Sequence, residues 1–172
     1  MNDLIYNQKK IPKRQWRYGL RSSAATGCGW IAVYNALRLM GYQVDVEKLI
    51  HYFTWQIPII NGNMGTFLFG PAIFFMQKGF SVKVTVRRKK FDKLVKDSNV
   101  CVMFYYWHRR FRFGAHFVAV RYQEGKFVGY NTYSNSVGPD IYGESLEEFL
   151  KKRSYHFPVL MAVRDKRKKC CN

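Results

Sequence analysis

The pattern of hydrophobic and polar residues changes along the chain, from helix-like in the first half to strand-like in the second. Residues 28–40 are apolar on nearly every helical face and are followed by Gly41, which predicts a helix that lies in the interior. Further helices are predicted over residues 45–53 and 66–79, the second with Pro71 in its first turn. The Pro- and Gly-containing residues 54–65 between them are predicted to form a loop.

From Phe80 onward the apolar residues alternate with polar ones, which predicts a half-buried strand over 80–86. The continuous apolar run 99–107 is typical of a central strand. Three more strands and two short helices complete the prediction, with Glu124-Gly125 as a hairpin turn: strands 116–122, 126–132 and 156–164, and helices 91–96 and 145–152. This order indicates an α+β domain in which a buried N-terminal helix packs on an antiparallel sheet.

The length of 172 residues is enough for one domain with a substantial core. We predict an N-terminal arm over residues 1–21, the domain over 22–164 and a basic tail over 165–172. No apolar run reaches the length of a membrane span, and the first residues lack the pattern of a secretory signal. A cytoplasmic location is therefore expected.

The chain is strongly basic, with 29 Lys and Arg against 11 Asp and Glu and a formal net charge of +18. Such a charge predicts attraction to polyanions, including nucleic acid, anionic membrane surfaces and acidic peptides. The basic residues fall in short clusters, and none of these clusters resembles a nucleic-acid-binding motif. Charge alone therefore indicates a class of partner and no particular fold.

Cys28 is the cysteine whose position suggests chemistry. It lies at the start of the predicted buried helix, with Thr26 as the expected N-cap, and the positive end of the helix dipole favours the nucleophilic thiolate. Cys101 falls in a buried strand and is expected to be a core residue, whereas Cys170 and Cys171 lie in the basic tail. The spacing of the cysteines fits no zinc site, so we expect neither a metal nor a cofactor.

A catalytic cysteine needs a base, and His116 is the best candidate because it begins an apolar strand after the small residues Gly114-Ala115. If Glu124-Gly125 is a two-residue turn, Asn131 lies diagonally across from His116 on the same face of the sheet. Its side chain could then accept the imidazole N–H and fix the tautomer. A three-residue loop would shift the register and place Asn131 on the other face.

The order and spacing of these residues resemble papain-like cysteine peptidases, in particular the bacterial C39-like branch that includes bacteriocin-leader-processing domains. The resemblance rests on four short blocks: Thr26-Gly27-Cys28-Gly29-Trp30, Met64-Gly65-Thr66, Gly114-Ala115-His116-Phe117-Val118-Ala119-Val120 and Val128-Gly129-Tyr130-Asn131-Thr132. It implies a papain-like fold, with Cys28 as the nucleophile, His116 as the base and Asn131 as the group that orients it.

One position departs from the pattern of the family. Such peptidases usually carry, six residues before the nucleophile, a Gln that helps to bind the oxyanion, and this chain has Ser22 there. Ser22, Ser23 and backbone N–H groups are the candidates to replace it. The loss of one oxyanion donor typically lowers the rate by about 10²–10³.

The leading hypothesis is a thiol hydrolase that cleaves peptide bonds through a thioester intermediate. An acyltransferase or transamidase would use the same residues, and a catalytically weak protein that binds polyanions or peptides on a papain-like scaffold is the other alternative. The basic aromatic segment 107–113 is expected to line a cleft for acidic or amphipathic peptides or to form an exposed basic loop. The candidate cleft residues are Trp30, Trp107, Arg109 and Arg110.

Overall fold

The structure is a computed structural model, and it describes residues 4–55, 65–109 and 112–167. Most of the loop predicted over 54–65, the tip of the segment 107–113 and both tail cysteines lie outside the described residues. Among the described residues, no helix is long and apolar enough to cross a membrane.

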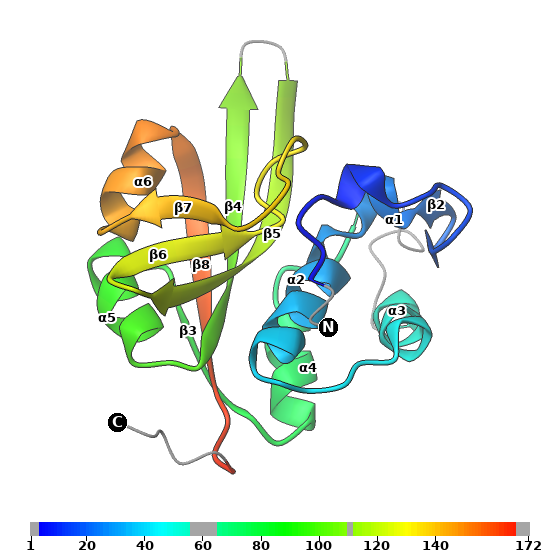
Figure 1. Cartoon of the computed structure of the whole chain (residues 1–172), viewed down its shortest axis with the longest axis horizontal. Coiled ribbons are helices and arrows are strands. Elements are labelled where there is room, and N and C mark those ends of the chain that lie inside the picture. Colours follow the sequence, from blue (N-terminus) through cyan, green and yellow to red (C-terminus); the bar gives the residue numbers. More distant parts are fainter. Residues whose placement is uncertain (1–3, 56–64, 110–111, 168–172) are drawn as a thin grey trace.

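The first part of the chain forms the helical side of the molecule (Figure 1). Its elements are the 3-10 helix η1 (Gln8–Lys10), the short strands β1 (Arg17–Tyr18) and β2 (Arg21–Ser22), and the helices α1 (Ser23–Thr26), α2 (Cys28–Leu39), α3 (Val46–Trp55) and α4 (Gly70–Gln77). The three predicted helices are confirmed, and Pro71 lies in the first turn of α4, where its missing N–H costs nothing.

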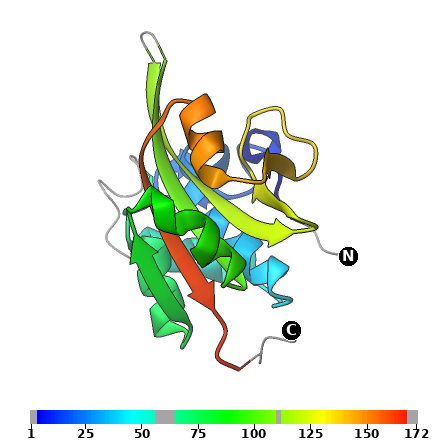
Figure 2. The ribbon, with the colours of Figure 1, turned by 90° about the vertical axis from the view of Figure 1, so that its left-hand side faces the viewer.

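The second part forms a six-stranded antiparallel sheet flanked by two helices (Figures 1 and 2). The strand order is β3-β8-β4-β5-β6-β7, so β4, the predicted central strand, has a neighbour on each side. The elements are β3 (Ser81–Thr85), the 3-10 helix η2 (Arg88–Lys90), α5 (Phe91–Lys96), β4 (Val100–Arg109), β5 (Arg112–Gln123), β6 (Lys126–Tyr130), β7 (Asp140–Gly143), α6 (Leu146–Lys152) and β8 (Tyr155–Arg164).

The hairpin between β5 and β6 has the register that the two-residue turn predicts. Gln123 pairs with Lys126, and Glu124 and Gly125 both have positive φ, as a type I′ turn requires. The pairing continues to Ala119 opposite Tyr130. Asn131 follows directly, with φ of 66°, so the chain leaves the sheet at this residue.

One structural detail corrects the prediction for the start of α2. Thr26 does not cap this helix, because it ends the preceding one-turn helix α1 and Gly27 occupies the cap position. The Gly27 N–H bonds to the carbonyl of Ser23, and the Gly27 carbonyl accepts from Ile31. A side chain at residue 27 would lie 2.6 Å from both the Ser23 carbonyl and the Trp30 indole, which explains the glycine.

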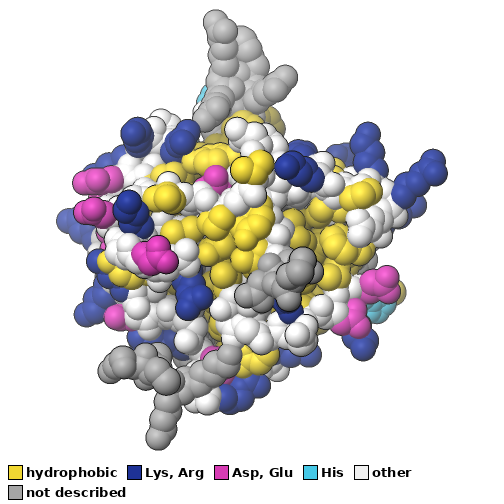
Figure 3. Space-filling model, viewed as in Figure 1, with side chains coloured by type: hydrophobic (Ala, Val, Ile, Leu, Met, Phe, Trp, Pro, Cys, Tyr) yellow, Lys and Arg dark blue, Asp and Glu magenta, His cyan; other side chains and the backbone are white. Residues whose placement is uncertain are grey.

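On the face shown in Figure 3, the basic residues are scattered. Figure 3 shows Lys and Arg side chains distributed around one face, with apolar side chains gathered at its centre. The chain therefore presents no single continuous basic patch on this face.

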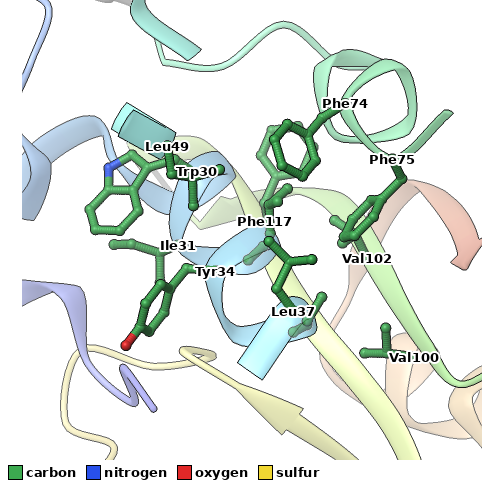
Figure 4. Close-up of a cluster of buried hydrophobic side chains, with 14 of the residues drawn as sticks. Trp30, Ile31, Tyr34, Leu37, Leu49, Phe74, Phe75, Val100, Val102 and Phe117 are labelled. Carbon is green, nitrogen blue, oxygen red and sulfur yellow. The ribbon is translucent and has the colours of Figure 1, made fainter. Parts of the chain in front are cut away.

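The interior has two apolar clusters, one on each face of the sheet. Val100 and Val102 of β4 pack toward α2, whereas Cys101 and Met103, which alternate with them, pack against α5 and α6. The sheet is thus buried on both faces, which explains why β4 reads as a continuous apolar run. Figure 4 shows the α2 cluster, in which side chains of α2 meet those of α3, α4, β4 and β5.

The predicted arm packs on the domain through specific contacts. Asn35 of α2 accepts the Ile5 N–H through Oδ1 at 2.9 Å and donates to the Ile5 carbonyl through Nδ2 at 2.8 Å. Tyr6 stacks on Tyr130, with ring centroids 6.2 Å apart. These contacts fix the segment that leads into η1.

Candidate active site

Cys28 is the first residue of α2, and its side chain is partly exposed. The backbone N–H groups of Cys28, Gly29 and Phe117 act on its sulfur and lower the pKa of the thiol. The first two belong to the first turn of α2, where N–H groups lack helical partners. The third belongs to β5 and directly follows His116, so the thiol lies where the start of the helix meets this strand.

The electrostatics of Cys28 differ from the prediction based on the helix dipole. Burial raises the pKa of the Cys28 thiol above its ordinary value, and this effect exceeds the opposing effects of the three backbone N–H groups and the Lys9 ammonium. The free thiol is therefore protonated at neutral pH. The loss of water around the sulfur, which the sequence argument did not include, thus outweighs the helix dipole in the free protein.

His116 lies on β5 opposite Tyr105 of β4 and is half-buried. Its Nε2 lies 2.6 Å from the backbone carbonyl oxygen of Asn131. Because a carbonyl oxygen only accepts hydrogen bonds, Nε2 carries the proton in the neutral ring, and Nδ1 is left as an acceptor. Burial, together with the Lys9 charge, lowers the pKa of His116, so the ring is neutral at pH 7.

The contact between Asn131 and His116 corrects one detail of the predicted triad. The imidazole is held by the main-chain carbonyl of Asn131, which the left-handed backbone of this residue turns toward the ring. The Asn131 side chain is engaged elsewhere: its Oδ1 accepts the Gln8 N–H at 2.8 Å, and its Nδ2 donates to Gln8 Oε1 at 3.1 Å. Asn131 thus orients the histidine through its backbone while Gln8 holds its side chain.

Gln8 and Lys9 are residues of the candidate site that the sequence argument missed. Gln8 is buried and also donates from Nε2 to the Ala24 carbonyl at 3.3 Å. Lys9 lies close enough for its charge to lower the pKa of both Cys28 and His116. Neither belongs to a motif, and Gln8 is separated from Asn131 by 123 residues, so no local signal indicates them.

A cleft of about 710 Å³ opens beside His116. Its walls come from the arm, from β4 and β5, from the loop after β6 and from the start of β8; they include Lys9, Tyr105, Trp107, Tyr133, Arg153 and Tyr155. Its volume is in the range of sites that bind small ligands or substrate side chains. We refer to it as the His116 cleft.

Comparison with solved structures finds a similar chain, the peptidase domain of Streptococcus ComA, a bi-functional ABC transporter involved in a quorum-sensing pathway. The TM-score is 0.50 at 16% sequence identity, and the match covers 80% of this chain and 92% of that one. The chain has a papain-like peptidase fold. No family model matches the sequence, and no curated protein matches it. The predicted α+β, papain-like architecture is confirmed.

The peptidase fold gathers some of the predicted site residues and leaves others away from the cleft. Trp107 lines the cleft beside His116. Trp30 does not line it, because its ring is fully buried in the α2 cluster and its indole N–H donates to Ser23 Oγ at 3.2 Å. The side chain of Arg109 and all of Arg110 lie outside the described residues.

The two serines proposed for the oxyanion occupy different environments in this peptidase fold. Ser23 is fully buried and accepts the Trp30 indole N–H, so its hydroxyl belongs to the core rather than to the cleft. Ser22 is half-buried and occupies the cap position of α1, where its side chain makes no capping bond. No group of His, Cys, Asp and Glu that could hold a metal is found in the described part of the chain.

The directions of these pKa shifts predict the pH dependence of Cys28 alkylation. Because the thiol pKa is raised and that of His116 is lowered, both groups are neutral at pH 7. We expect the rate with iodoacetamide to rise about tenfold per pH unit from neutral pH and to continue rising beyond pH ~9, because only the thiolate reacts. The rate constants are measured by mass spectrometry of the Cys28 peptide. A plateau below pH ~8 would contradict the neutral pair and indicate a thiolate–imidazolium pair.

Proposed function

We propose that the protein is a cysteine peptidase in which Cys28 is the nucleophile and His116 the general base. The observation that carries the proposal is the His116–Asn131 contact: Nε2 is occupied by a carbonyl acceptor, which leaves Nδ1 free to take a proton. The backbone N–H of Phe117, the residue after His116, acts on the Cys28 sulfur, so the proposed nucleophile lies beside the strand that carries the proposed base.

The proposed reaction begins from the neutral pair. As the Cys28 sulfur attacks the carbonyl carbon of the peptide bond, Nδ1 of His116 takes the thiol proton. The tetrahedral intermediate then collapses, the C–N bond breaks, and the imidazolium gives this proton to the leaving amine. Water attacks the resulting thioester, with His116 again taking a proton, and the cysteine leaves as the thiol once that proton returns to sulfur.

Main-chain donors support the oxyanion in this proposal. The N–H groups of Cys28 and Gly29 converge on the sulfur, and an oxyanion that forms on the carbon bonded to this sulfur would lie close to them. They are our candidates for the role of the missing glutamine, and the half-buried Ser22 hydroxyl stands as the side-chain candidate. The role of the third group, which orients the base, is assigned to Asn131, which Gln8 holds in place.

Covalent trapping tests the proposal. A peptidyl acyloxymethyl ketone, which reacts as a substrate analogue, is expected to modify Cys28 and to leave Cys101 unmodified, as read by mass spectrometry of peptides. Cys101 is fully buried, and burial raises its pKa to about 12. Trapping is measured in a variant in which Cys170 and Cys171 are replaced by Ser, so that exposed tail thiols do not compete.

Two controls make the trapping result specific. Cys28→Ser should abolish the modification while keeping the melting temperature, because serine is close in size to cysteine. Heat-unfolded protein should lose the preference for Cys28, since both thiols are then equally accessible. Equal modification of Cys28 and Cys101 in the folded protein, or none at either, would rule out the proposed peptidase.

A further inference from the structure

The His116 cleft has an unusual balance of charge. Two cationic side chains, Lys9 and Arg153, line it, and none of its lining residues is acidic. Neither takes part in the salt bridges found among the described residues, which join Lys48 to Asp45, Lys151 to Glu147 and Arg167 to Asp165. Two positive charges therefore line a concave site without a carboxylate partner.

The position of Arg153 is set by an aromatic contact. It is the C-terminal cap residue of α6, and its guanidinium lies over the ring of Tyr133, 5.0 Å from the centroid. This contact restricts the side chain of Arg153. The N–H groups of the guanidinium that do not face the Tyr133 ring stay available as hydrogen-bond donors. The charge of the Asp140 carboxylate helps to raise the pKa of Tyr133, and this carboxylate accepts a hydrogen bond from Ser136 Oγ at 2.6 Å. Asp140 is not among the residues that line the cleft.

One residue that lines the cleft, Tyr105, carries a buried hydroxyl. Tyr105 is 1% exposed, and its phenol oxygen is buried with no hydrogen-bond partner in the described structure. Its ring stacks on that of Tyr155, with centroids 4.1 Å apart, and Tyr133 forms a further wall. Burial raises the pKa of Tyr105 well above its usual value and that of Tyr133 to about 12, so both stay neutral donors.

We propose that the His116 cleft is a subsite that binds a carboxylate-bearing residue of the peptide substrate, with Lys9 and Arg153 selecting the negative charge. The proposal rests on the proposed peptidase function and adds its substrate class. A buried phenol without a partner is costly, and a carboxylate oxygen is an acceptor that would satisfy it. Lys9 also couples to both Cys28 and His116, which places the selected charge close to the reacting groups.

Two small alkylating reagents test the charge preference. Iodoacetate carries a carboxylate and iodoacetamide does not, while both react with the thiolate, so the ratio of their rates at Cys28 is independent of the thiol pKa. Lys9→Gln and Arg153→Gln are each expected to lower this ratio about two- to fivefold at low salt. The ratio of the wild-type protein should itself fall as salt is added.

Matched variants separate the cleft from the general charge of +18. Lys10→Gln and Lys152→Gln remove neighbouring exposed cations that do not line the cleft, and they should leave the ratio unchanged. Lys9→Arg keeps the positive charge and should keep the ratio of the two alkylation rates. A lower ratio in Lys9→Arg would mean that the substitution disturbs the structure rather than the charge. The inference is overturned if Lys9→Gln and Arg153→Gln behave like Lys10→Gln and Lys152→Gln.

Direct binding identifies the ligand class. N-acetylglutamate amide is expected to shift the NMR signals of the His116 imidazole at concentrations where N-acetylglutamine amide does not, and Arg153→Gln should remove the difference. Equal shifts with both compounds would overturn the subsite even if the alkylation ratio responds. Failure of the acyloxymethyl ketone to trap Cys28 overturns the peptidase alone, because neither the alkylation ratio nor the NMR shift requires acyl chemistry.

Discussion

Replacing His116 by Ala is expected to lower the rate of Cys28 trapping by the acyloxymethyl ketone by about 10²–10⁴ at pH 7. The reason is that Cys28 and His116 are both neutral before the reaction. Because burial raises the pKa of the Cys28 thiol, nucleophilic attack depends on a base that removes its proton during the reaction. The Asn131 carbonyl holds the ring with Nδ1 as its free acceptor. The rate is followed by mass spectrometry of the intact protein.

Two comparisons distinguish a base from a structural residue. His51→Ala makes the same change at an exposed position of α3 and should leave trapping unchanged. Added imidazole should partly restore trapping in His116→Ala, because it can enter the vacated space and accept the proton, whereas it should not act on wild-type protein. A His116→Ala protein that keeps its melting temperature and traps at the wild-type rate would remove His116 from the mechanism.

Gly29→Ala is expected to destabilise the fold, although alanine normally favours a helix over glycine by about 1 kcal/mol. A Cβ at residue 29 would lie 2.1 Å from Oγ1 and 2.3 Å from Cβ of Thr66. Thr66 is buried, and its hydroxyl is bonded to the Tyr18 phenol at 3.0 Å, so it has little room to move. Overpacking of this kind lowers the free energy of unfolding by about 1–3 kcal/mol. Thermal unfolding, which shifts by roughly 2–4 °C per kcal/mol at this size, measures it.

Gly138→Ala provides the matched control for this substitution. A Cβ at residue 138 meets no atom within 4 Å, so the melting temperature should stay within about 1 °C of the wild-type value. Because Gly29 directly follows the proposed nucleophile, its substitution should also slow Cys28 trapping. Unchanged or higher stability in Gly29→Ala would show that α2 can move away from Thr66 without loss.

The elements of the fold were predictable because their patterns are local. The interior helix at 28–40, the central strand at 99–107 and the two-residue turn at Glu124-Gly125 each follow from neighbouring residues, and the structure confirms all three. Strand β7 was not predicted, because its four residues carry no alternating pattern and are fixed by pairing with β6. The start of α2 was misassigned to Thr26 because a one-turn helix precedes it.

The site was only partly predictable, for a different reason. Cys28 and His116 belong to recognisable blocks; His116 lines the cleft, and Cys28 lies beside Phe117 of β5. The atom by which Asn131 holds His116 depends on a positive φ that no sequence pattern near it specifies. Gln8 and Lys9 lie in a polar arm whose destination is set by tertiary contacts alone.

The contact between Gln8 and Asn131 has a consequence for the order in which the site is made. Residues 4–11 leave the ribosome before β6 exists, yet their partners include Asn131 and the Ser134 carbonyl, which accepts from Asn7 Nδ2 at 2.6 Å. The contacts of the arm with Asn131 and Ser134 form only after these distant residues have been made, although its contacts with Asn35 and Ala24 can form early, and closing so long a loop is entropically unfavourable until the sheet has formed. The surroundings of His116, which Asn131 holds, are thus completed late in folding, so a nascent chain carries an incomplete candidate site.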